Sequence, residues 1–96
     1  MIEDKVDILR SEFPIFSSNP KLIYMDSAAT SQRPKSVIDK VVEVYNNYNS
    51  NVHRGIYAMA EKVTQEYEDS RKEIASFLGA DNDEIIFTKN TTESIN

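Results

Sequence analysis

The sequence from 84 to 96 reads Glu84-Ile85-Ile86-Phe87-Thr88-Lys89-Asn90-Thr91-Thr92-Glu93-Ser94-Ile95-Asn96. Its apolar run, 85–87, is typical of a strand that is buried on both faces. A polar turn, Lys89-Asn90, follows, and Thr91-Thr92-Glu93 then indicates the start of a helix. The first N–H groups of a helix have no internal partners, and the helix dipole adds partial positive charge there. With two threonine hydroxyls at the same place, the stretch is suited to binding a phosphate.

The same stretch has a second interpretation that needs no ligand. Asn90 and Glu93 fit a capping box, in which the glutamate carboxylate accepts a hydrogen bond from the N–H of the N-cap residue. The helix end would then be satisfied internally. These residues alone leave both interpretations open.

Composition excludes several classes of function. A length of 96 residues allows one small domain, and a net charge of −5 argues against non-specific binding to nucleic acid or to an anionic membrane. There is no apolar run long enough to span a membrane, and the acidic first residues are unlike a signal or transit peptide. Without cysteine and with a single histidine, neither a disulfide framework nor a metal site is expected. We expect a soluble, cytoplasmic protein.

The remainder of the chain alternates apolar patterns with turns. Apolar spacing predicts a helix over 3–11 that stops at Phe13-Pro14, and a second helix over 34–48 with one buried face. A third helix is predicted from about Ala58 to Gly79, with Glu68 and Lys72 paired on its exposed face. Residues 22–25 are a short strand candidate, followed by the small residues of Asp26-Ser27-Ala28-Ala29-Thr30, and 81–83 is a turn.

Two strands separated by two long helices favour an α/β sheet protein in the order helix, strand, helix, helix, strand, helix start. Two short strands cannot form such a sheet alone, and a strand that is buried on both faces needs neighbours. We therefore expect residues 1–96 to be the N-terminal part of a larger domain.

A second candidate site is the run His53-Arg54-Gly55, in a polar loop between the two long helices. Histidine next to arginine could transfer a proton or bind a carboxylate. Taken alone, the run is better explained by an ordinary surface loop with a glycine turn. The chain has no glycine-rich phosphate loop and no dinucleotide-binding motif, since it contains only two glycines.

Three segments together resemble one family. They are 24–34 (Tyr-Met-Asp-Ser-Ala-Ala-Thr-Ser-Gln-Arg-Pro), 49–57 (Asn-Ser-Asn-Val-His-Arg-Gly-Ile-Tyr) and 85–96. In this order and at this spacing they resemble the N-terminal segment of the SufS-type cysteine desulfurases, within the class V aminotransferases of pyridoxal-phosphate fold type I. The resemblance extends over the whole chain but over only about the first quarter of such an enzyme.

The resemblance implies an enzyme that uses pyridoxal 5′-phosphate to convert L-cysteine to L-alanine. The sulfur is left as an enzyme persulfide for an acceptor protein of iron–sulfur cluster assembly, and the parent is a homodimer. Thr91 and Thr92 correspond to the family's phosphate-binding turn. Ala28 and Ala29 correspond to a loop that closes over the substrate, and His53 and Arg54 to a loop near the mouth of the active site. Asn90 replaces a glycine of many relatives, and asparagine tolerates the same turn.

The resemblance also implies that the principal catalytic groups lie beyond Asn96. These are the Schiff-base lysine, the histidine on the pyridine ring, the aspartate at its nitrogen and the persulfide cysteine. We therefore expect residues 1–96 alone to be inactive. A selenocysteine lyase, another class V aminotransferase and a non-enzymatic helical interaction module remain alternatives.

Overall fold

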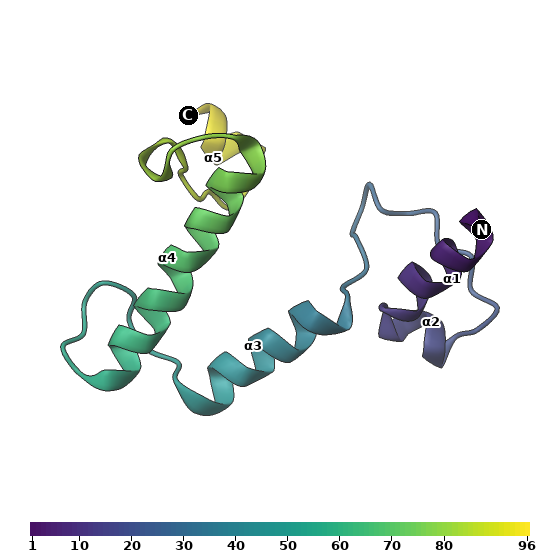
Figure 1. The fold of residues 1–96 in the computed structure, drawn as a ribbon, viewed down its shortest axis with the longest axis horizontal. Coiled ribbons are helices and arrows are strands. Elements are labelled where there is room, and N and C mark those ends of the chain that lie inside the picture. The colour runs from purple at the N-terminus through teal and green to yellow at the C-terminus, as the bar shows by residue number, and fades with distance from the viewer. The chain divides into compact units, whose positions relative to one another are not determined.

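The computed structural model describes all of residues 1–96, which divide into two compact units, Met1–Asn47 and Tyr48–Asn96. Both units are helical (Figure 1). In chain order the elements are α1 (Ile2–Ser11), α2 (Pro14–Ser18), α3 (Lys35–Asn47), α4 (Ala58–Leu78), the 3-10 turn η1 (Asn82–Glu84) and α5 (Thr91–Ile95). No helix combines the length and the apolar composition that crossing a membrane requires.

In the first unit α1 and α2 pack together (Figure 1). The predicted end of α1 before Phe13-Pro14 is confirmed, but the sequence interpretation missed that Pro14 also begins α2. Proline is well tolerated at the first position of a helix, because the N–H it lacks would have no partner there. The Arg10 guanidinium of α1 lies 3.9 Å from the Phe16 ring centroid of α2. Its Nη2 also donates to the Leu22 carbonyl at 2.6 Å.

The two long helices are confirmed almost to the residue. The structure places α3 at Lys35–Asn47, where 34–48 was predicted, and α4 ends at Leu78 before Gly79. Gly79 has φ 69° and ψ 31°, and its N–H donates to the carbonyls of Ala75 and Ser76. The Ala80 N–H also donates to Ala75 at 2.9 Å. This left-handed glycine cap satisfies the last carbonyls of α4.

The turn predicted at 81–83 is the 3-10 turn η1, which packs against α4. A capping box begins it, in which the Asp81 N–H donates to the Glu84 carboxylate at 2.7 Å. η1 therefore turns the chain back after α4 and sends residues 85–88 along that helix.

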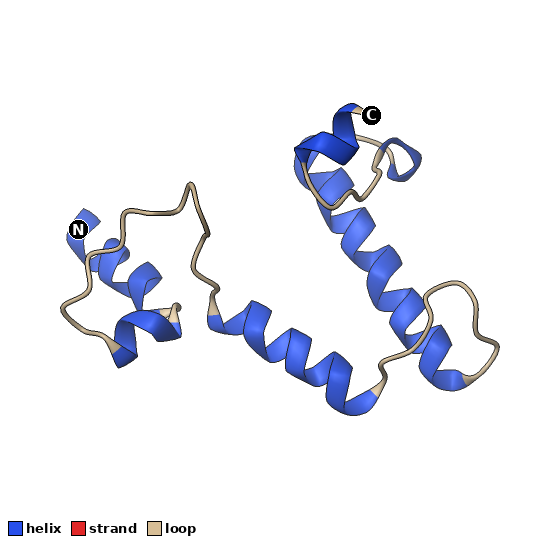
Figure 2. Ribbon diagram, turned by 180° about the vertical axis from the view of Figure 1, so that it is seen from behind, coloured by secondary structure: helices blue, strands red, loops and turns tan.

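Neither predicted strand forms, which corrects the strand assignments over 22–25 and 85–87 (Figure 2). A β-strand is defined by hydrogen bonds to a neighbouring strand, and neither segment has such a neighbour within the chain. Ile85 does have extended dihedral angles, φ −100° and ψ 121°. Each segment is instead held by one arginine from a helix of its own unit: Arg10 donates to Leu22, and Arg71 donates to Ile85.

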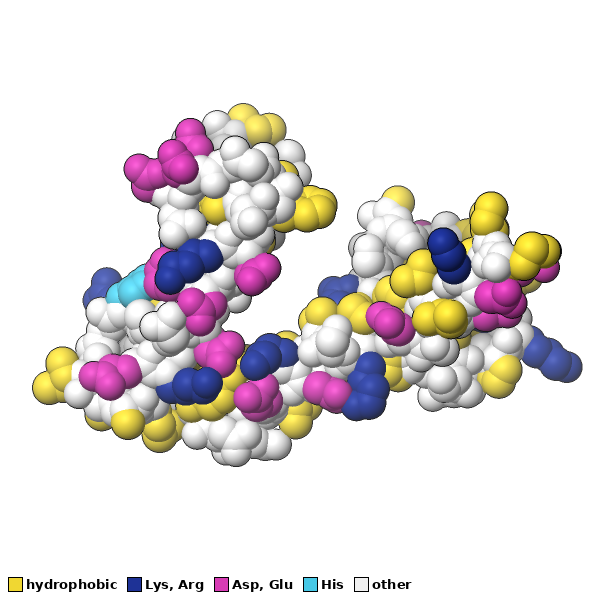
Figure 3. Space-filling model, viewed as in Figure 1, with side chains coloured by type: hydrophobic (Ala, Val, Ile, Leu, Met, Phe, Trp, Pro, Cys, Tyr) yellow, Lys and Arg dark blue, Asp and Glu magenta, His cyan; other side chains and the backbone are white.

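The hydrophobic core of this chain is small. Only Tyr48, Ala60 and Ala75 are buried apolar residues. The apolar face predicted for α3 is largely exposed, with Val41 and Val42 each about half accessible. Hydrophobic side chains accordingly lie on the visible surface of both units (Figure 3). The amphipathic patterns in the sequence therefore predict faces that these residues do not cover by themselves.

Candidate functional site

The Thr-Thr turn has several hydrogen-bond donors without a protein acceptor. Thr91 and Thr92 are the first residues of α5, and both are exposed. No protein group accepts a hydrogen bond from their N–H groups, and their hydroxyls are likewise without a partner. Four donors on two adjacent residues at a helix start are suited to phosphate oxygens.

The capping interpretation is also correct in part. The Asn90 side-chain oxygen accepts from the Glu93 N–H at 2.9 Å, as a capping box requires. The Glu93 carboxylate, however, accepts from the N–H of Lys89 at 2.9 Å and not from that of Asn90. The Asn90 cap satisfies the N–H of Glu93 and leaves those of Thr91 and Thr92 free, so capping and anion binding are compatible.

The loop that contains His53 is fixed on the first turns of α4. His53 has φ 62°, and it is the only residue other than glycine with a positive φ. Its N–H donates to the Thr64 hydroxyl at 2.9 Å. Gly55 does not supply the left-handed conformation. A Cβ atom on Gly55 would lie 2.2 Å from the Cβ of Ala60, which is fully buried. Glycine is needed here because the loop backbone touches α4, not because of a glycine turn.

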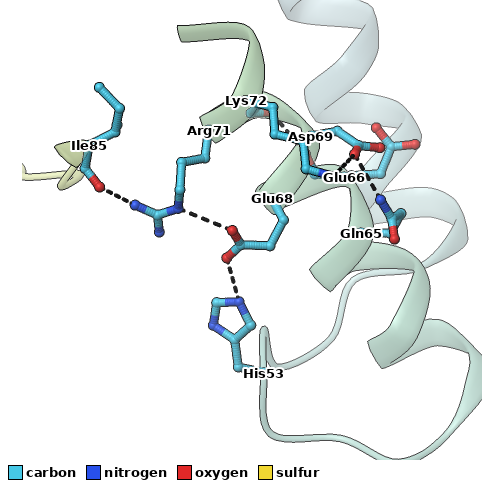
Figure 4. A network of polar contacts seen from close by, with 9 residues as sticks. His53, Gln65, Glu66, Glu68, Asp69, Arg71, Lys72 and Ile85 are labelled. Atoms are coloured by element: carbon cyan, nitrogen blue, oxygen red, sulfur yellow. Dashed lines mark hydrogen bonds and ion pairs between the residues drawn. The ribbon is translucent and has the colours of Figure 1, made fainter. Parts of the chain in front are cut away.

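A chain of polar contacts runs from His53 through α4 to residue 85 (Figure 4). The His53 Nε2 atom lies 2.7 Å from Glu68 Oε1. The other carboxylate oxygen of Glu68 accepts from Arg71 Nε at 3.1 Å, and Arg71 Nη1 donates to the Ile85 carbonyl. The predicted pair between Glu68 and Lys72 is therefore wrong, and Lys72 instead lies 3.8 Å from Asp69.

Aromatic rings accompany this polar chain. The rings of His53 and Tyr67 meet edge to face with centroids 5.6 Å apart, and Tyr67 meets Phe87 in the same way at 5.1 Å. The Arg71 guanidinium lies 5.0 Å from the Phe87 centroid and 5.5 Å from that of Tyr67. Edge-to-face and cation–π contacts of this kind each stabilise by roughly 0.5–1.5 kcal/mol. They hold the segment before the Thr-Thr turn against α4.

Glu68 is the one group with a clear electrostatic perturbation. Partial desolvation raises the pKa of Glu68, but the hydrogen bonds from His53 and Arg71, together with their charges, outweigh it and leave the pKa below its ordinary value. Glu68 is therefore ionised at neutral pH, and an ionised carboxylate only accepts hydrogen bonds.

An open groove of 330 Å³ lies beside this network, lined by His53, Gly55, Glu61, Thr64, Gln65 and Glu68. Arg54, next to His53, is exposed and makes no hydrogen bond or ion pair with another protein group. Its guanidinium is therefore available for a carboxylate.

Ala28 and Ala29 lie in the first unit, on an exposed turn in which the N–H groups of Ala29 and Thr30 donate to the Asp26 carbonyl at 3.0 and 3.2 Å. The Tyr24 hydroxyl is hydrogen-bonded to the carbonyls of Asp26 and Thr30 and so closes the turn. A cavity of 350 Å³ adjoins it, with Tyr24, Ser27 and Ser31 among its lining residues.

The second unit thus connects the His53 loop to the segment that leads to Thr91 and Thr92. The connecting residues, Glu68 and Arg71, were missed as site residues. Because Glu68 and Arg71 are three residues apart on one helix, the sequence could have predicted the ion pair between them. Nothing in the sequence indicated contacts with residues 14 and 15 positions away.

A phosphate-bearing cofactor fits the donors that the second unit offers. Thr91 and Thr92 present two N–H groups and two hydroxyls, whereas the negative charge of Glu93 in the same turn opposes an anion. That carboxylate is already engaged with the Lys89 N–H. The donor set suits a phosphate held by hydrogen bonds and the helix terminus.

Several known proteins that are similar to this chain are cysteine desulfurases. It is 43% identical to the cysteine desulfurase of Haloferax volcanii over 95% of this chain and 25% of the relative. It is 45% identical to the cysteine desulfurase SufS of Plasmodium falciparum over 92% of this chain and 16% of that protein. The solved apo structure of a cysteine desulfurase from Thermococcus onnurineus matches with a TM-score of 0.81 and 43% identity, over 93% of this chain and 22% of the other.

The chain therefore spans about a quarter or less of the length of these relatives. The sequence profile that describes the class V aminotransferases matches residues 23–96, which is most of the chain. That match includes both the His53 loop and the Thr-Thr turn. On this evidence the chain belongs to the class V aminotransferase family.

Proposed function

We propose that residues 1–96 supply the phosphate-binding turn and the substrate-side loops of a cytoplasmic, homodimeric cysteine desulfurase of fold type I. The enzyme removes sulfur from L-cysteine, releases L-alanine and passes the sulfur to an acceptor protein of iron–sulfur cluster assembly. The observation that carries this proposal is the similarity to a solved cysteine desulfurase at 43% identity and a TM-score of 0.81.

Pyridoxal 5′-phosphate, when bound, supplies the electron sink that allows the carbon–sulfur bond of L-cysteine to be broken. Thr92 and Thr91 would hold its phosphate with their free N–H groups and hydroxyls. Asn90 keeps this turn in place by capping α5 through the Glu93 N–H. The role of the turn is therefore to bind and orient, and the proton chemistry is left to other groups.

The remaining site residues act on the substrate side. Ala28 and Ala29 leave room for the amino acid because their side chains end at Cβ. The Arg54 guanidinium, free of protein partners, can bind a carboxylate in a bidentate manner. His53 presents an imidazole that can hold or move a proton. These roles are supported by the resemblance of their segments to those of the desulfurases and by the exposure of the four residues.

The proposal is tested by product analysis. The full-length protein, loaded with pyridoxal 5′-phosphate and supplied with L-cysteine and a thiol reductant, should release equimolar L-alanine and sulfide. The 96-residue polypeptide serves as the control and should release neither, because it has no cysteine to receive the sulfur. Alanine from L-selenocysteine but not from L-cysteine, or amino-group transfer without alanine, would contradict the proposed reaction.

A further inference from the structure

Two loops of the candidate site meet the same pair of side chains on α4. Glu68 binds His53 of the first loop at 2.7 Å, and Arg71 binds the carbonyl of Ile85, which precedes the Thr-Thr turn. Glu68 and Arg71 also bind each other at 3.1 Å (Figure 4). The path from the His53 loop to residue 85 is therefore continuous, and every member of it is hydrogen-bonded.

We propose that Glu68 and Arg71 form a clamp that fixes the His53 loop relative to the segment leading to the phosphate-binding turn, and that Glu68 selects the tautomer of His53 in which Nδ1 is an unprotonated acceptor. Both side chains are positioning residues, since they act through His53 and Ile85. The inference rests on the proposed function only in the roles that it gives to the two loops.

The tautomer follows from the chemistry of the partners. An ionised glutamate has no proton to donate, so the hydrogen atom between Glu68 Oε1 and His53 Nε2 belongs to the histidine. A neutral imidazole carries one N–H, and Nδ1 is then an acceptor. No protein group is hydrogen-bonded to Nδ1. Carboxylates orient histidines in the same way behind metal ions and in catalytic sites.

The clamp depends on the shape of the arginine as well as on its charge. Arg71 uses Nε for Glu68 and Nη1 for Ile85, so two atoms of one planar group serve two partners. A lysine would keep the charge but has a single nitrogen on a flexible stem. The charged and titratable groups that face Glu68 are His53 and Arg71. Tyr67 lies against the rings of the same cluster.

Hydrogen exchange of the full-length protein tests the clamp. Arg71→Lys should speed amide exchange about tenfold or more in both 52–55 and 85–88, because the hydrogen bonds of the guanidinium to Glu68 and Ile85 that link the two segments are lost. The middle of α4 should remain as protected as in the wild type. Glu73→Ala is the control, since Glu73 lies exposed on α4 and has no partner. It should change neither segment.

Nitrogen NMR of His53 tests the tautomer, with its signals assigned by their loss in His53→Gln. Wild-type protein should show Nε2 protonated and Nδ1 unprotonated in the neutral ring, and Glu68→Ala should shift the ring toward a mixture of tautomers. Neither measurement requires the cofactor, so a protein that fails to bind pyridoxal 5′-phosphate still tests the clamp. Protonated Nδ1 in the wild type would overturn the proposal. Faster exchange in one segment only, or throughout α4, would also overturn it.

Discussion

At the scale of single residues, the left-handed backbone conformation and the close approach to α4 in the loop 53–55 belong to two different residues. His53 adopts the left-handed backbone conformation, and Gly55 allows the loop to touch α4. Histidine is among the residue types that tolerate positive φ. The imidazole is thereby directed to Glu68 while the backbone N–H reaches Thr64. The backbone and the side chain of His53 are thus both fixed by α4.

Gly55→Ala should destabilise the full-length protein by about 1–3 kcal/mol, the usual cost of overpacking a tight contact. The new Cβ would lie 2.2 Å from that of Ala60, which sits on a helix and cannot move aside. Urea unfolding measures the effect. Ala60→Gly alone is the matched control, and combining it with Gly55→Ala should recover part of the loss. If the two losses simply add, the contact is not the cause.

The carboxyl group of Glu68 should titrate below the ordinary glutamate value of about 4.3. A lowered pKa in the folded state means that the ionised form is stabilised by folding. This contribution is complete above the ordinary pKa and is lost as the pH falls through the lowered one. Carbon NMR of the side chain measures the titration. Arg71→Gln removes a facing charge and should raise the midpoint, and an unchanged midpoint would contradict the hydrogen-bonded pair.

Side-chain contacts between residues far apart in the chain could not be predicted from the sequence. The four-residue spacing predicted an ion pair between Glu68 and Lys72, but in the structure Glu68 binds His53 and Arg71 instead. Three-residue and four-residue spacings on a helix are both compatible with an ion pair. The fold decides between them by bringing His53 and Ile85 to the same side of α4. Asn90 and Glu93, which lie within one turn, were by contrast predicted as a cap.

At the scale of elements, the long helices α3 and α4 were predictable because each is specified by its own residues, whereas the short helix α2 was missed. Pro34 precedes α3 and Gly79 ends α4, and both signals act within a few positions. The segments 22–25 and 85–87 were not predictable in this way, since a strand requires a partner. Alternate apolar residues in them are strongly exposed, with Ile23 and Ile86 each 82% accessible, whereas Leu22, Tyr24 and Ile85 are partly buried. We interpret both segments as extended chain suited to a neighbouring strand.

Gly79→Ala should cost about 1 kcal/mol of the free energy of unfolding, because the residue has φ 69° and a Cβ disfavours that conformation. No heavy atom lies within 4 Å of the added Cβ, so the loss would report backbone strain alone. Thermal unfolding of the full-length protein measures it. Gly79→Asn should cost less, since asparagine tolerates the left-handed region. Equal losses for the two variants would argue against this explanation.

At the scale of the whole molecule, the 96 residues bury too little apolar surface for an ordinary folded domain. Tyr48, Ala60 and Ala75 are the buried apolar residues, and Ala side chains contribute little transfer free energy. Ile56 and Phe77, in contrast, are 97% and 89% exposed. Burial of such side chains is the main favourable term in folding. The amphipathic faces of this chain therefore depend on contacts that it does not make with itself.

The 96-residue polypeptide should consequently unfold without a sharp transition. Circular dichroism on heating should show a broad, weakly cooperative loss of helix, because the conformational entropy of ordering is offset by few buried contacts. The fluorescence of a dye that binds exposed apolar surface should increase when the dye is mixed with this polypeptide at room temperature. A steep melt of the monomer, with calorimetric and van't Hoff enthalpies in agreement, would contradict this prediction.

The most direct test of the central claim is the dissociation constant of pyridoxal 5′-phosphate for the full-length protein and two variants at Thr92. Thr92→Ala should weaken binding about 10- to 100-fold, the equivalent of a hydrogen bond to a charged group. Thr92→Ser keeps the hydroxyl and should bind nearly as tightly as the wild type. Equal affinity of wild type and Thr92→Ala for the cofactor would contradict the assignment of this turn to its phosphate.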